Sequence, residues 1–280
     1  MPRMVHPQTG AEPYPGYRLV GIRGRGAFGE VWEAAAPGDT RVALKFLYCN
    51  SNQSAAREIK SLQSIRRLMH PHLIRIDQVW CCERYVVVAM ELADCSLAEL
   101  LDKYMKEAGT PIAPAHACLL LTDAAEGLDF LNARHHLIDD RLVAIQHCDI
   151  NPRNLLIVGE HLKVSDFSLC SLMGETQESR RRAGTLDYCA PEVFQGRLSS
   201  QTDQYALAIT YCVLRGGRLP FTDTPENFSR NYFRPAPDLS MLSSKEQPII
   251  ARALNPIPQS RWPTCGEMMQ ALSRIICQAA

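Results

Sequence analysis

The chain carries the stretch His147-Cys148-Asp149-Ile150-Asn151-Pro152-Arg153-Asn154, followed twelve residues later by Asp166-Phe167-Ser168. Apolar residues after the first segment and a turn at Gly159-Glu160 predict a hairpin between the two. The layout provides one carboxylate, Asp149, with an asparagine five residues on and a second carboxylate seventeen residues on. A carboxylate is able to accept a proton, and carboxylate and amide oxygens are ligands for hard divalent metal ions.

Phosphoryl transfer requires this set of groups, because its chemistry consists mostly of positioning and charge neutralisation. Four fixed positions match by chance about once in 10⁵ starting points, so the motif alone is a good hypothesis. The stretch resembles the catalytic and metal-binding loops of the protein kinase family. The resemblance implies that Asp149 accepts the proton of a substrate hydroxyl, that Asn154 and Asp166 hold Mg²⁺, and that ATP is the phosphoryl donor.

Length and composition exclude several classes of protein. At 280 residues the chain suits one large domain or two lobes that share an interface. Its 30 basic and 30 acidic residues cancel, so bulk charge does not indicate a nucleic acid or a membrane surface as partner. The 11 cysteines are scattered and, without an apolar signal segment, predict reduced thiols in a cytoplasmic protein. No apolar run approaches the ~20 residues of a membrane helix.

The N-terminal part of the chain leads into a glycine motif. Residues 1–16 are rich in proline, glycine and polar residues, which predicts a flexible segment. A strand-like pattern from Tyr17 then leads to Gly24, Gly26 and Gly29. Dinucleotide-binding folds share this spacing, but there the third glycine opens a helix. The alternating residues that follow here predict two strands, so the glycines lie in a hairpin whose backbone is able to close over phosphates.

Lys45 ends a Val-Ala-Leu-Lys segment on the third predicted strand. In the kinase pattern a lysine at this place pairs the α- and β-phosphates, and a surface lysine at a strand end is the alternative. The resemblance further assigns Val31, Ala43 and, in the second lobe, Leu156 to the nucleotide site. Arg23 departs from the family, which usually has an aliphatic residue before the first glycine.

The apolar spacing from Ser54 to Met69 predicts a helix. The resemblance implies a glutamate on this helix that pairs with Lys45, and Glu58 is the only acidic residue between Lys45 and Asp77. Glu58 lies thirteen residues before Pro71, about one helical turn farther than is usual in the family. A glutamate on a solvated helix face is the alternative.

The stretches 73–76 and 84–90 predict the last two strands of a five-stranded first lobe. The residues that follow, Met90-Glu91-Leu92-Ala93-Asp94, resemble the hinge between kinase lobes, with Met90 as gatekeeper. The resemblance implies that the Glu91 carbonyl and the Ala93 amide bind adenine through the backbone.

From Ser96 onward the apolar spacing is helical, so the second lobe is predicted to be mostly α. The chain between Leu131 and His147 is about twice as long as in most kinases, which predicts an elaborated loop. This loop contains His135-His136 and Asp139-Asp140. Solvated side chains are a better interpretation of these residues than a metal site, because nothing in the sequence fixes ligand geometry.

Three residues of the central stretch depart from the family pattern. Cys148 replaces an arginine, so the loop lacks the Arg-Asp pair (non-RD), and Ser168 replaces a glycine. Asn151 replaces a lysine that contacts the transferring phosphate in Ser/Thr kinases. Tyrosine kinases also lack that lysine and carry an arginine directly before the asparagine ligand, where this chain has Arg153. Arg153 is therefore a candidate for the missing charge, and a solvated arginine is an alternative of equal weight.

Residues 166–192 resemble an activation segment that ends in Gly184-Thr185-Leu186-Asp187-Tyr188-Cys189-Ala190-Pro191-Glu192. The resemblance is to the Ser/Thr class, in which the threonine, here Thr185, bonds to the catalytic aspartate. The run Arg180-Arg181-Arg182 is either solvated or a contact for phosphate or an acidic substrate. By resemblance, Asp203 braces the backbone of the catalytic loop and Arg261 pairs with Glu192.

These markers run in family order from Gly24 to Arg261, and the chain is identified as a member of the protein kinase family, most similar to bacterial kinases of the eukaryotic (Hanks) type. The implied fold is α+β and two-lobed. A small β-rich N-lobe with one regulatory helix spans residues 17–92, and a larger, mostly α-helical C-lobe spans residues 93–280. Together they form one kinase domain, 17–280.

The implied function is ATP-dependent phosphoryl transfer to serine or threonine hydroxyls of a protein substrate, without a nucleic-acid or membrane partner. The main alternative is a pseudokinase that binds ATP or acts as a signalling scaffold, which Cys148, Asn151 and Ser168 support. The other alternative is a small-molecule phosphotransferase, but such enzymes usually lack the Ala-Pro-Glu segment present here.

Overall fold

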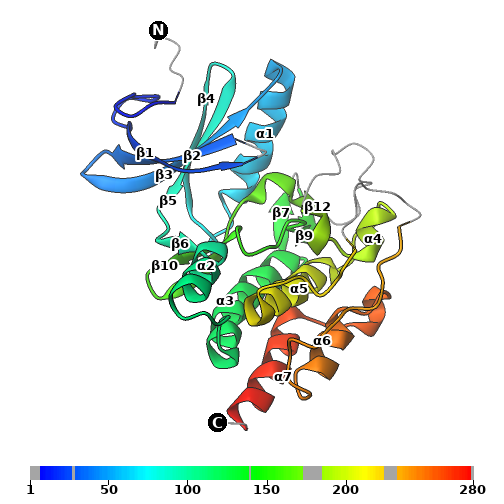
Figure 1. Ribbon diagram of the computed structural model, residues 1–280. Helices are drawn as coiled ribbons and strands as arrows, with labels where there is room; N and C mark the ends of the chain where they lie inside the picture. Colours follow the sequence, from blue (N-terminus) through cyan, green and yellow to red (C-terminus); the bar gives the residue numbers. More distant parts are fainter. Residues whose placement is uncertain (1–6, 27–28, 139, 173–184, 224–231, 279–280) are drawn as a thin grey trace. The chain divides into compact units, whose positions relative to one another are not determined.

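The computed structural model describes residues 7–26, 29–138, 140–172, 185–223 and 232–278 (Figure 1). The chain divides into two compact units. Unit 1 contains Met1–Met69 and Ile74–Asp94, and unit 2 contains His70–Leu73 and Cys95–Ala280. The sequence places the boundary after Leu92, and the division assigns the short segment His70–Leu73 to unit 2 in addition.

Unit 1 is built on an antiparallel sheet of five strands in the order β1-β2-β3-β5-β4, with helix α1 packed against β4 and β5 (Figure 1). Alternating apolar residues of these strands form one core that includes Leu19, Trp32, Leu44, Phe46 and Val87. The elements are β1 (Arg18–Gly26), β2 (Gly29–Ala36), β3 (Thr40–Tyr48), α1 (Asn52–Ile65), β4 (Ile76–Cys82) and β5 (Tyr85–Glu91).

The predicted fourth strand was misplaced, because β4 spans Ile76–Cys82 rather than 73–76. Glu83 adopts a left-handed conformation (φ 53°), and the tight turn pairs Cys82 with Tyr85. The residues directly before this turn are therefore the ones that pair with β5. Leu73 instead forms a parallel bridge with Val164 in unit 2.

Helix α1 begins and ends earlier than the predicted range 54–69. The Ser51 side chain accepts a hydrogen bond from Ser54 N at 3.1 Å and caps the first turn. A tight turn from Leu68 N to Ile65 O (2.8 Å) closes the other end, and Met69 is 67% exposed. The prediction extended too far because apolar spacing alone does not show where a helix ends.

The predicted flexible segment 1–16 includes residues that are bonded to the sheet. Gly10 N donates to Leu19 O and Leu19 N donates to Ala11 O, both at 2.8 Å. The Tyr14 ring lies 5.0 Å from the Trp80 ring on β4. Part of this segment therefore pairs with β1 and covers an aromatic side chain of the sheet.

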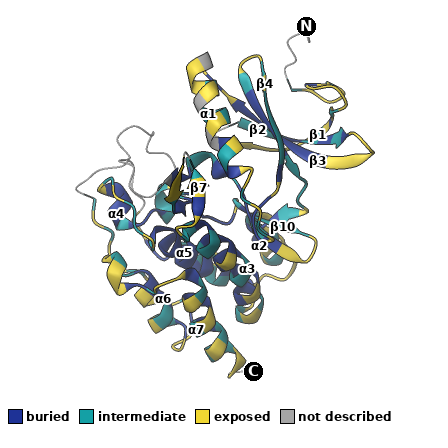
Figure 2. Ribbon diagram, turned by 180° about the vertical axis from the view of Figure 1, so that it is seen from behind, coloured by how far each residue is buried: buried dark blue, intermediate teal, exposed yellow. Residues whose placement is uncertain are grey.

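Unit 2 is organised around α3 (Pro114–Asn132) and α5 (Thr202–Gly216), which pack against each other. Residues 202–212 of α5 are buried without interruption, whereas buried residues alternate with more exposed ones along α3 (Figure 2). A helix that is surrounded by other elements needs apolar residues on every side. The apolar residues of α5 therefore extend around the helix rather than along one face. The other helices are α2 (Leu97–Glu107), α4 (Pro191–Phe194), α6 (Gln247–Ala253) and α7 (Cys265–Cys277), with 3₁₀ turns η1 (Phe167–Leu169), η3 (Leu186–Tyr188) and η4 (Pro258–Ser260).

Short strands complete unit 2 and position the central stretch. The order β11-β10-β6 forms a three-stranded sheet, and β7–β8 and β12–β9 form two-stranded pairs. The predicted elaborated loop is thus a hairpin, β7–β8, followed by β9; Asp139 lies outside the described residues. The strands are β6 (Cys95–Ser96), β7 (His136–Ile138), β8 (Arg141–Val143), β9 (Ile145–Gln146), β10 (Leu155–Val158), β11 (His161–Val164) and β12 (Ser171–Leu172).

Gly127 marks a close approach within unit 2. A Cβ atom at this position of α3 would lie 2.8 Å from the carbonyl oxygen of His72 and 3.2 Å from Leu73 Cδ2. We expect Gly127→Ala to lower the free energy of unfolding by about 1–2 kcal/mol, because the overlap outweighs the gain of about 1 kcal/mol in helix propensity. Urea denaturation measures this.

Gly21→Ala is the matched control, because a Cβ there meets nothing within 4 Å. Its free energy of unfolding should change by less than about 1 kcal/mol. A Gly127→Ala protein that is more stable than the unmodified chain would contradict the close approach.

Candidate functional site

Asp149 is held by donors from three residues. One carboxylate oxygen, Oδ1, accepts hydrogen bonds from Thr185 N (3.0 Å) and Thr185 Oγ1 (3.1 Å). The other, Oδ2, accepts one from Asn154 Nδ2 at 2.8 Å. Asp149 is only 8% exposed, so these bonds fix the orientation of a nearly buried carboxylate.

Asn151 is part of the same network. Its Nδ2 donates to Asp149 O (3.1 Å) and Asp149 Oδ1 (3.2 Å), and lies 3.4 Å from Thr185 Oγ1. Its Oδ1 accepts a hydrogen bond from Arg153 N at 3.0 Å. At the position where the resemblance leads one to expect an exposed cation, the chain has a buried amide that braces Asp149.

Asp203 anchors the backbone before Asp149. Its Oδ2 accepts a hydrogen bond from His147 N (2.7 Å) and its Oδ1 accepts one from Cys148 N (2.8 Å). Cys148 is in the left-handed conformation (φ 68°), which is unfavourable for a residue other than glycine. Burial raises the pKa of the Asp203 carboxyl, while the His147 ring and the two backbone N–H groups act in the opposite direction.

Asn154 and Asp166 are both fixed by local hydrogen bonds. The Asn154 amide nitrogen donates to Asp149, which leaves its Oδ1 on the other side of the amide group. Asp166 is left-handed (φ 64°), and its Oδ1 accepts a hydrogen bond from Ser168 Oγ at 2.8 Å. The serine that replaces the family's glycine therefore bonds to the predicted metal ligand.

The remaining predicted residues of unit 2 are Arg153 and Leu156. The Arg153 side chain is exposed. Burial raises the pKa of the Tyr188 hydroxyl to about 12, and the positive charge of Arg153 lowers this pKa. Leu156 lies on β10, where it pairs with Ser96 of β6. Residues 173–184, which include the run 180–182, lie outside the described residues.

The predicted glycine hairpin is present in unit 1. Gly24 pairs with Val31, and Gly26 pairs with Gly29 across the β1–β2 turn, whose tip lies outside the described residues. Gly29 has φ 138°, and a Cβ there would lie 1.8 Å from Phe46 O. Only glycine is compatible with this contact.

Lys45 and Ala43 lie on β3, and Val31 pairs with Lys45 across β2 and β3. Lys45 is half-buried, as is Glu58 on helix α1. Ala43 pairs with Met90 across β3 and β5. The sheet thus brings the glycine hairpin, the lysine strand and the predicted gatekeeper strand together, as the sequence pattern predicts.

The predicted hinge residues make contacts of their own in unit 1. Glu91 Oε1 accepts a hydrogen bond from Arg75 N at 2.7 Å. Arg23 Nη2 lies 3.3 Å from the carbonyl oxygens of Ala93 and Asp94 and donates to them. The arginine that departs from the family pattern therefore holds the end of the predicted hinge.

Glu192 and Arg261 form a buried, bidentate ion pair. Arg261 Nη1 donates to Glu192 Oε1 (2.8 Å) and Nη2 donates to Oε2 (2.7 Å), and the guanidinium lies over the Tyr205 ring. Such a pair fixes geometry because both hydrogen bonds must form together. The ion pair connects the start of α4, which contains Glu192, to the segment between η4 and α7, which contains Arg261.

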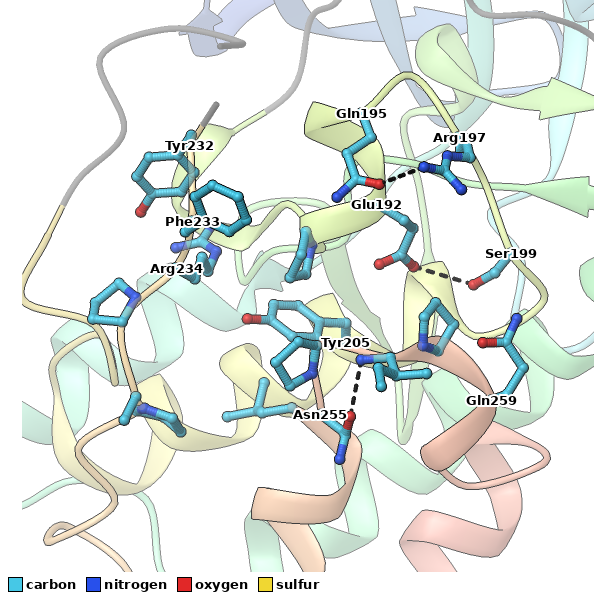
Figure 3. A pocket seen from close by; sticks show the side chains of 18 of the residues that line it. Glu192, Gln195, Arg197, Ser199, Tyr205, Tyr232, Phe233, Arg234, Asn255 and Gln259 are labelled. Atoms are coloured by element: carbon cyan, nitrogen blue, oxygen red, sulfur yellow. Dashed lines mark hydrogen bonds between the residues drawn. The ribbon is translucent and has the colours of Figure 1, made fainter. Parts of the chain in front are cut away.

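A cavity of about 790 Å³ lies beside this ion pair (Figure 3). Glu192 and Tyr205 line it together with Arg234, which sequence reasoning missed. Arg234 donates to the carbonyl oxygens of Leu186 (2.6 Å) and Asp187 (2.8 Å), and its guanidinium also lies over aromatic rings. Arg234 therefore fixes the backbone just after Thr185, and no motif in the sequence marks it.

Comparison with known proteins matches the family "Protein kinase domain" over residues 17–272. The chain is 29% identical to CBL-interacting protein kinase 4 of Oryza sativa subsp. japonica, over 89% of this chain and 56% of that protein. It is 28% identical to serine/threonine-protein kinase PknD of Mycobacterium tuberculosis, over 94% of this chain and 40% of that protein. The chain thus spans about half the length of these relatives, and a plant and a bacterial kinase match it alike.

Within the described ranges, each helix is too short or too polar to span a lipid bilayer. The five-stranded sheet of unit 1, the helical unit 2 and the family match over 17–272 agree with one another. The chain belongs to the protein kinase family and has its α+β fold, with a β-sheet N-lobe and a helical C-lobe.

Proposed function

We propose that the chain transfers the γ-phosphoryl group of ATP to serine or threonine hydroxyls of proteins. The observation that carries the proposal is the Asp149 carboxylate, nearly buried and bonded to Thr185, Asn151 and Asn154. A base acts on a hydroxyl only when its carboxylate is correctly oriented, and these donors fix that orientation. The relatives named as serine/threonine-protein kinases support the same acceptor class.

Thr185 links the base to the acceptor. It donates two hydrogen bonds to Oδ1 of Asp149, which leaves Oδ2, shared with Asn154, to accept a proton from a substrate hydroxyl. Arg234 holds the carbonyl groups directly after Thr185 and so fixes the segment that would lie against the acceptor peptide. A threonine at this place is also the mark of the Ser/Thr class by resemblance.

The donor set fits Mg²⁺. The Asn154 oxygen and the Asp166 carboxylate are the kind of hard oxygen ligands that Mg²⁺ prefers, and hydrogen bonds fix both side chains. We therefore assign Asn154 and Asp166 as the metal ligands. When bound, ATP with Mg²⁺ supplies the phosphoryl group and neutralises its charge.

In unit 1, the glycine hairpin is the proposed contact for phosphates. Gly29 tolerates no side chain, because Phe46 O lies where a Cβ would be. Lys45 is proposed to bind the α- and β-phosphates and to pair with Glu58. The remaining residues proposed to contact ATP are Gly24, Gly26, Val31, Ala43, Glu91, Ala93 and, in unit 2, Leu156.

The alternative function is a non-catalytic scaffold or ATP-binding module. It is supported by the departures at Cys148, Asn151 and Ser168. Yet Asn151 and Ser168 each donate a hydrogen bond to a carboxylate of the site, Asp149 and Asp166 respectively. Residues that reinforce the base and the metal ligand favour the enzyme over the scaffold.

We also propose that the chain works in a reducing compartment, the cytoplasm. All 11 cysteines are thiols rather than disulfides, and seven of them are buried or partly buried in the helical unit. Thiols of this kind persist where disulfides are reduced. No charge excess in the sequence favours a nucleic-acid partner.

Asp149→Asn tests catalysis against scaffolding. It should abolish phosphoryl transfer and largely spare ATP binding, because the base acts on the acceptor hydroxyl. Asp166→Ala should weaken both. Labelling of protein from radioactive ATP measures phosphoryl transfer, and a fluorescent ATP analogue measures ATP binding. The control is Glu160→Gln, in the exposed turn between β10 and β11. Equal labelling by the unmodified chain and Asp149→Asn would establish the scaffold.

Arg153→Ala tests whether this arginine replaces the missing lysine. If the guanidinium stabilises the transferring phosphoryl group, its loss should cost about 2–4 kcal/mol, or roughly 30- to 1000-fold in kcat. Steady-state kinetics at saturating ATP measure this, with Arg141→Ala on the exposed β8 as control. An unchanged kcat would mean that Arg153 is simply solvated.

The absence of an arginine at Cys148 predicts activity without phosphorylation of the activation segment. Many kinases use that arginine to grip a phosphate, and cysteine has neither its charge nor its forked donors. Treatment with a phosphatase should leave the initial rate within about threefold of the rate after treatment with an inactivated phosphatase. Thr176 and Ser179 lie outside the described residues. The initial rates of Thr176→Ala and Ser179→Ala should likewise stay within about threefold of the rate of the unmodified chain. A loss of about 100-fold would refute this.

A further inference from the structure

Three elements of unit 2 bring two histidines and an aspartate together. His72 lies in the segment between α1 and β4, Asp123 on α3, and His161 at the start of β11. One ligating atom from each residue lies within 4.8 Å of the other two. The cluster uses none of the residues assigned above to ATP, Mg²⁺ or the acceptor.

Two separations between the ligating atoms are close to those around a tetrahedral ion. His72 Nδ1 lies 3.5 Å from Asp123 Oδ2, and His161 Nδ1 lies 3.7 Å from the same oxygen. Zinc bonds of about 2.0–2.1 Å place two ligands of a tetrahedron about 3.3 Å apart. The observed separations exceed this by a few tenths of an ångström, which small rotations of the side chains would close.

Glu126 provides the outer contact that a metal-binding histidine requires. It lies one turn along α3 from Asp123, and its Oε2 is 3.3 Å from His72 Nε2. A carboxylate at this distance favours the proton on Nε2, which turns the lone pair of Nδ1 toward Asp123 and His161. Carboxylate–histidine–metal arrangements of this kind orient the ring and raise its basicity as a ligand.

The Leu162 backbone interacts with both inner ligands. Leu162 N donates to Asp123 Oδ2 at 2.9 Å, which fixes the carboxylate. Leu162 O lies 3.1 Å from His72 Nδ1 and accepts a hydrogen bond from it when that nitrogen carries the proton. Binding of an ion therefore requires the neutral tautomer protonated on Nε2, the form that Glu126 favours.

Two ligands are held rigidly and the third is accessible. His72 is 8% exposed, its carbonyl accepts a hydrogen bond from Val164 N, and Gly127 packs against it. The His161 side chain is 64% exposed. An ion can thus enter from the His161 side, where a water molecule would complete four ligands.

The ligand chemistry points to zinc. Mg²⁺ and Ca²⁺ prefer oxygen ligands throughout, whereas two imidazoles with one carboxylate suit Zn²⁺. An ion pair between His72 and the carboxylates of Asp123 and Glu126 accounts for the position of His72. His161 Nδ1 lies 3.7 Å from the same Asp123 oxygen, so two imidazole rings converge on one carboxylate oxygen. We propose that His72, Asp123 and His161 form a site for one Zn²⁺ ion, with Glu126 as the outer ligand of His72.

Bound zinc would tie the segment His70–Leu73 to α3 and β11. This segment is where the chain leaves α1 and reaches β4. Occupancy therefore adds a crosslink among three elements of unit 2 and stabilises the folded state by linkage. Neither the proposed base nor the proposed nucleotide contacts take part.

The test is calorimetric titration of the full chain with Zn²⁺ alone. Exposed thiols compete for zinc, so the chain used in the titration carries Cys81→Ser and Cys277→Ser, which remove both exposed thiols. We expect one equivalent of Zn²⁺ per chain. His161→Ala, at an exposed position, should weaken this binding by about 100-fold, and Glu126→Ala by about 10-fold.

His135→Ala is the matched control, because it removes an exposed histidine outside the cluster. It should leave the affinity for Zn²⁺ unchanged. Co²⁺ should give visible bands of a tetrahedral nitrogen–oxygen site without thiolate charge transfer. In addition, Zn²⁺ at about 100 times its Kd for the unmodified chain should raise the Tm of that chain clearly and raise the Tm of His161→Ala much less.

Three results would overturn the proposal. The first is equal zinc affinity in the chain with Cys81→Ser and Cys277→Ser and in the same chain with His161→Ala added. The second is a loss of affinity in His135→Ala instead, which would place the ion at the β7–β8 hairpin. The third is a thiolate spectrum with Co²⁺, which would place it on the remaining cysteines.

Discussion

The Asp203 carboxylate is the constraint on which the stretch of residues 147–154 depends. It is buried within α5 and accepts the N–H groups of His147 and Cys148, at the point where the backbone turns left-handed. A left-handed non-glycine residue costs roughly 1–2 kcal/mol, and a buried carboxylate without partners costs more. Each group therefore offsets the penalty of the other. Because α5 is the most deeply buried helix of unit 2, the core itself sets the position of Asp149.

Beyond Asp203, uncharged hydrogen-bond donors hold the Asp149 carboxylate in place. Asn151 and Asn154 both donate to Asp149, and Thr185 approaches it from the far end of the activation segment. Arg234 and the Glu192–Arg261 pair then hold the residues after Thr185. The departures from the family at Asn151 and Ser168 fit this arrangement, since each replaces a family residue with a hydrogen-bond donor to a carboxylate.

Much of the fold and site follows from local sequence, and the rest depends on distant partners. The glycine hairpin, the lysine strand and the Asp149–Asp166 stretch are short, contiguous patterns, so periodicity and motif suffice to place them. Apolar spacing does not show the turn to Ile65 O that closes α1. It also does not show the turn at Glu83 that sets β4, or the bridge that pairs Leu73 with Val164 instead. Arg234 and the His72–Asp123–His161 cluster join residues that lie 38 to 89 positions apart in the sequence, and only tertiary packing brings them together.

The bond between Ser168 and Asp166 has a consequence for inhibitor selectivity. Ser168 donates to the Asp166 carboxylate, and a side chain replaces the glycine that eases rotation of this backbone. A ligand that binds only when this segment has rotated must break a hydrogen bond to a charged group, worth about 1.5–3 kcal/mol. Its affinity falls by roughly 10- to 150-fold relative to a glycine-containing relative, since the competent conformer is rarer by that factor. Compounds that bind without rotation of this segment leave the hydrogen bond intact and have no such penalty. They are therefore the better starting point for inhibitors of this chain.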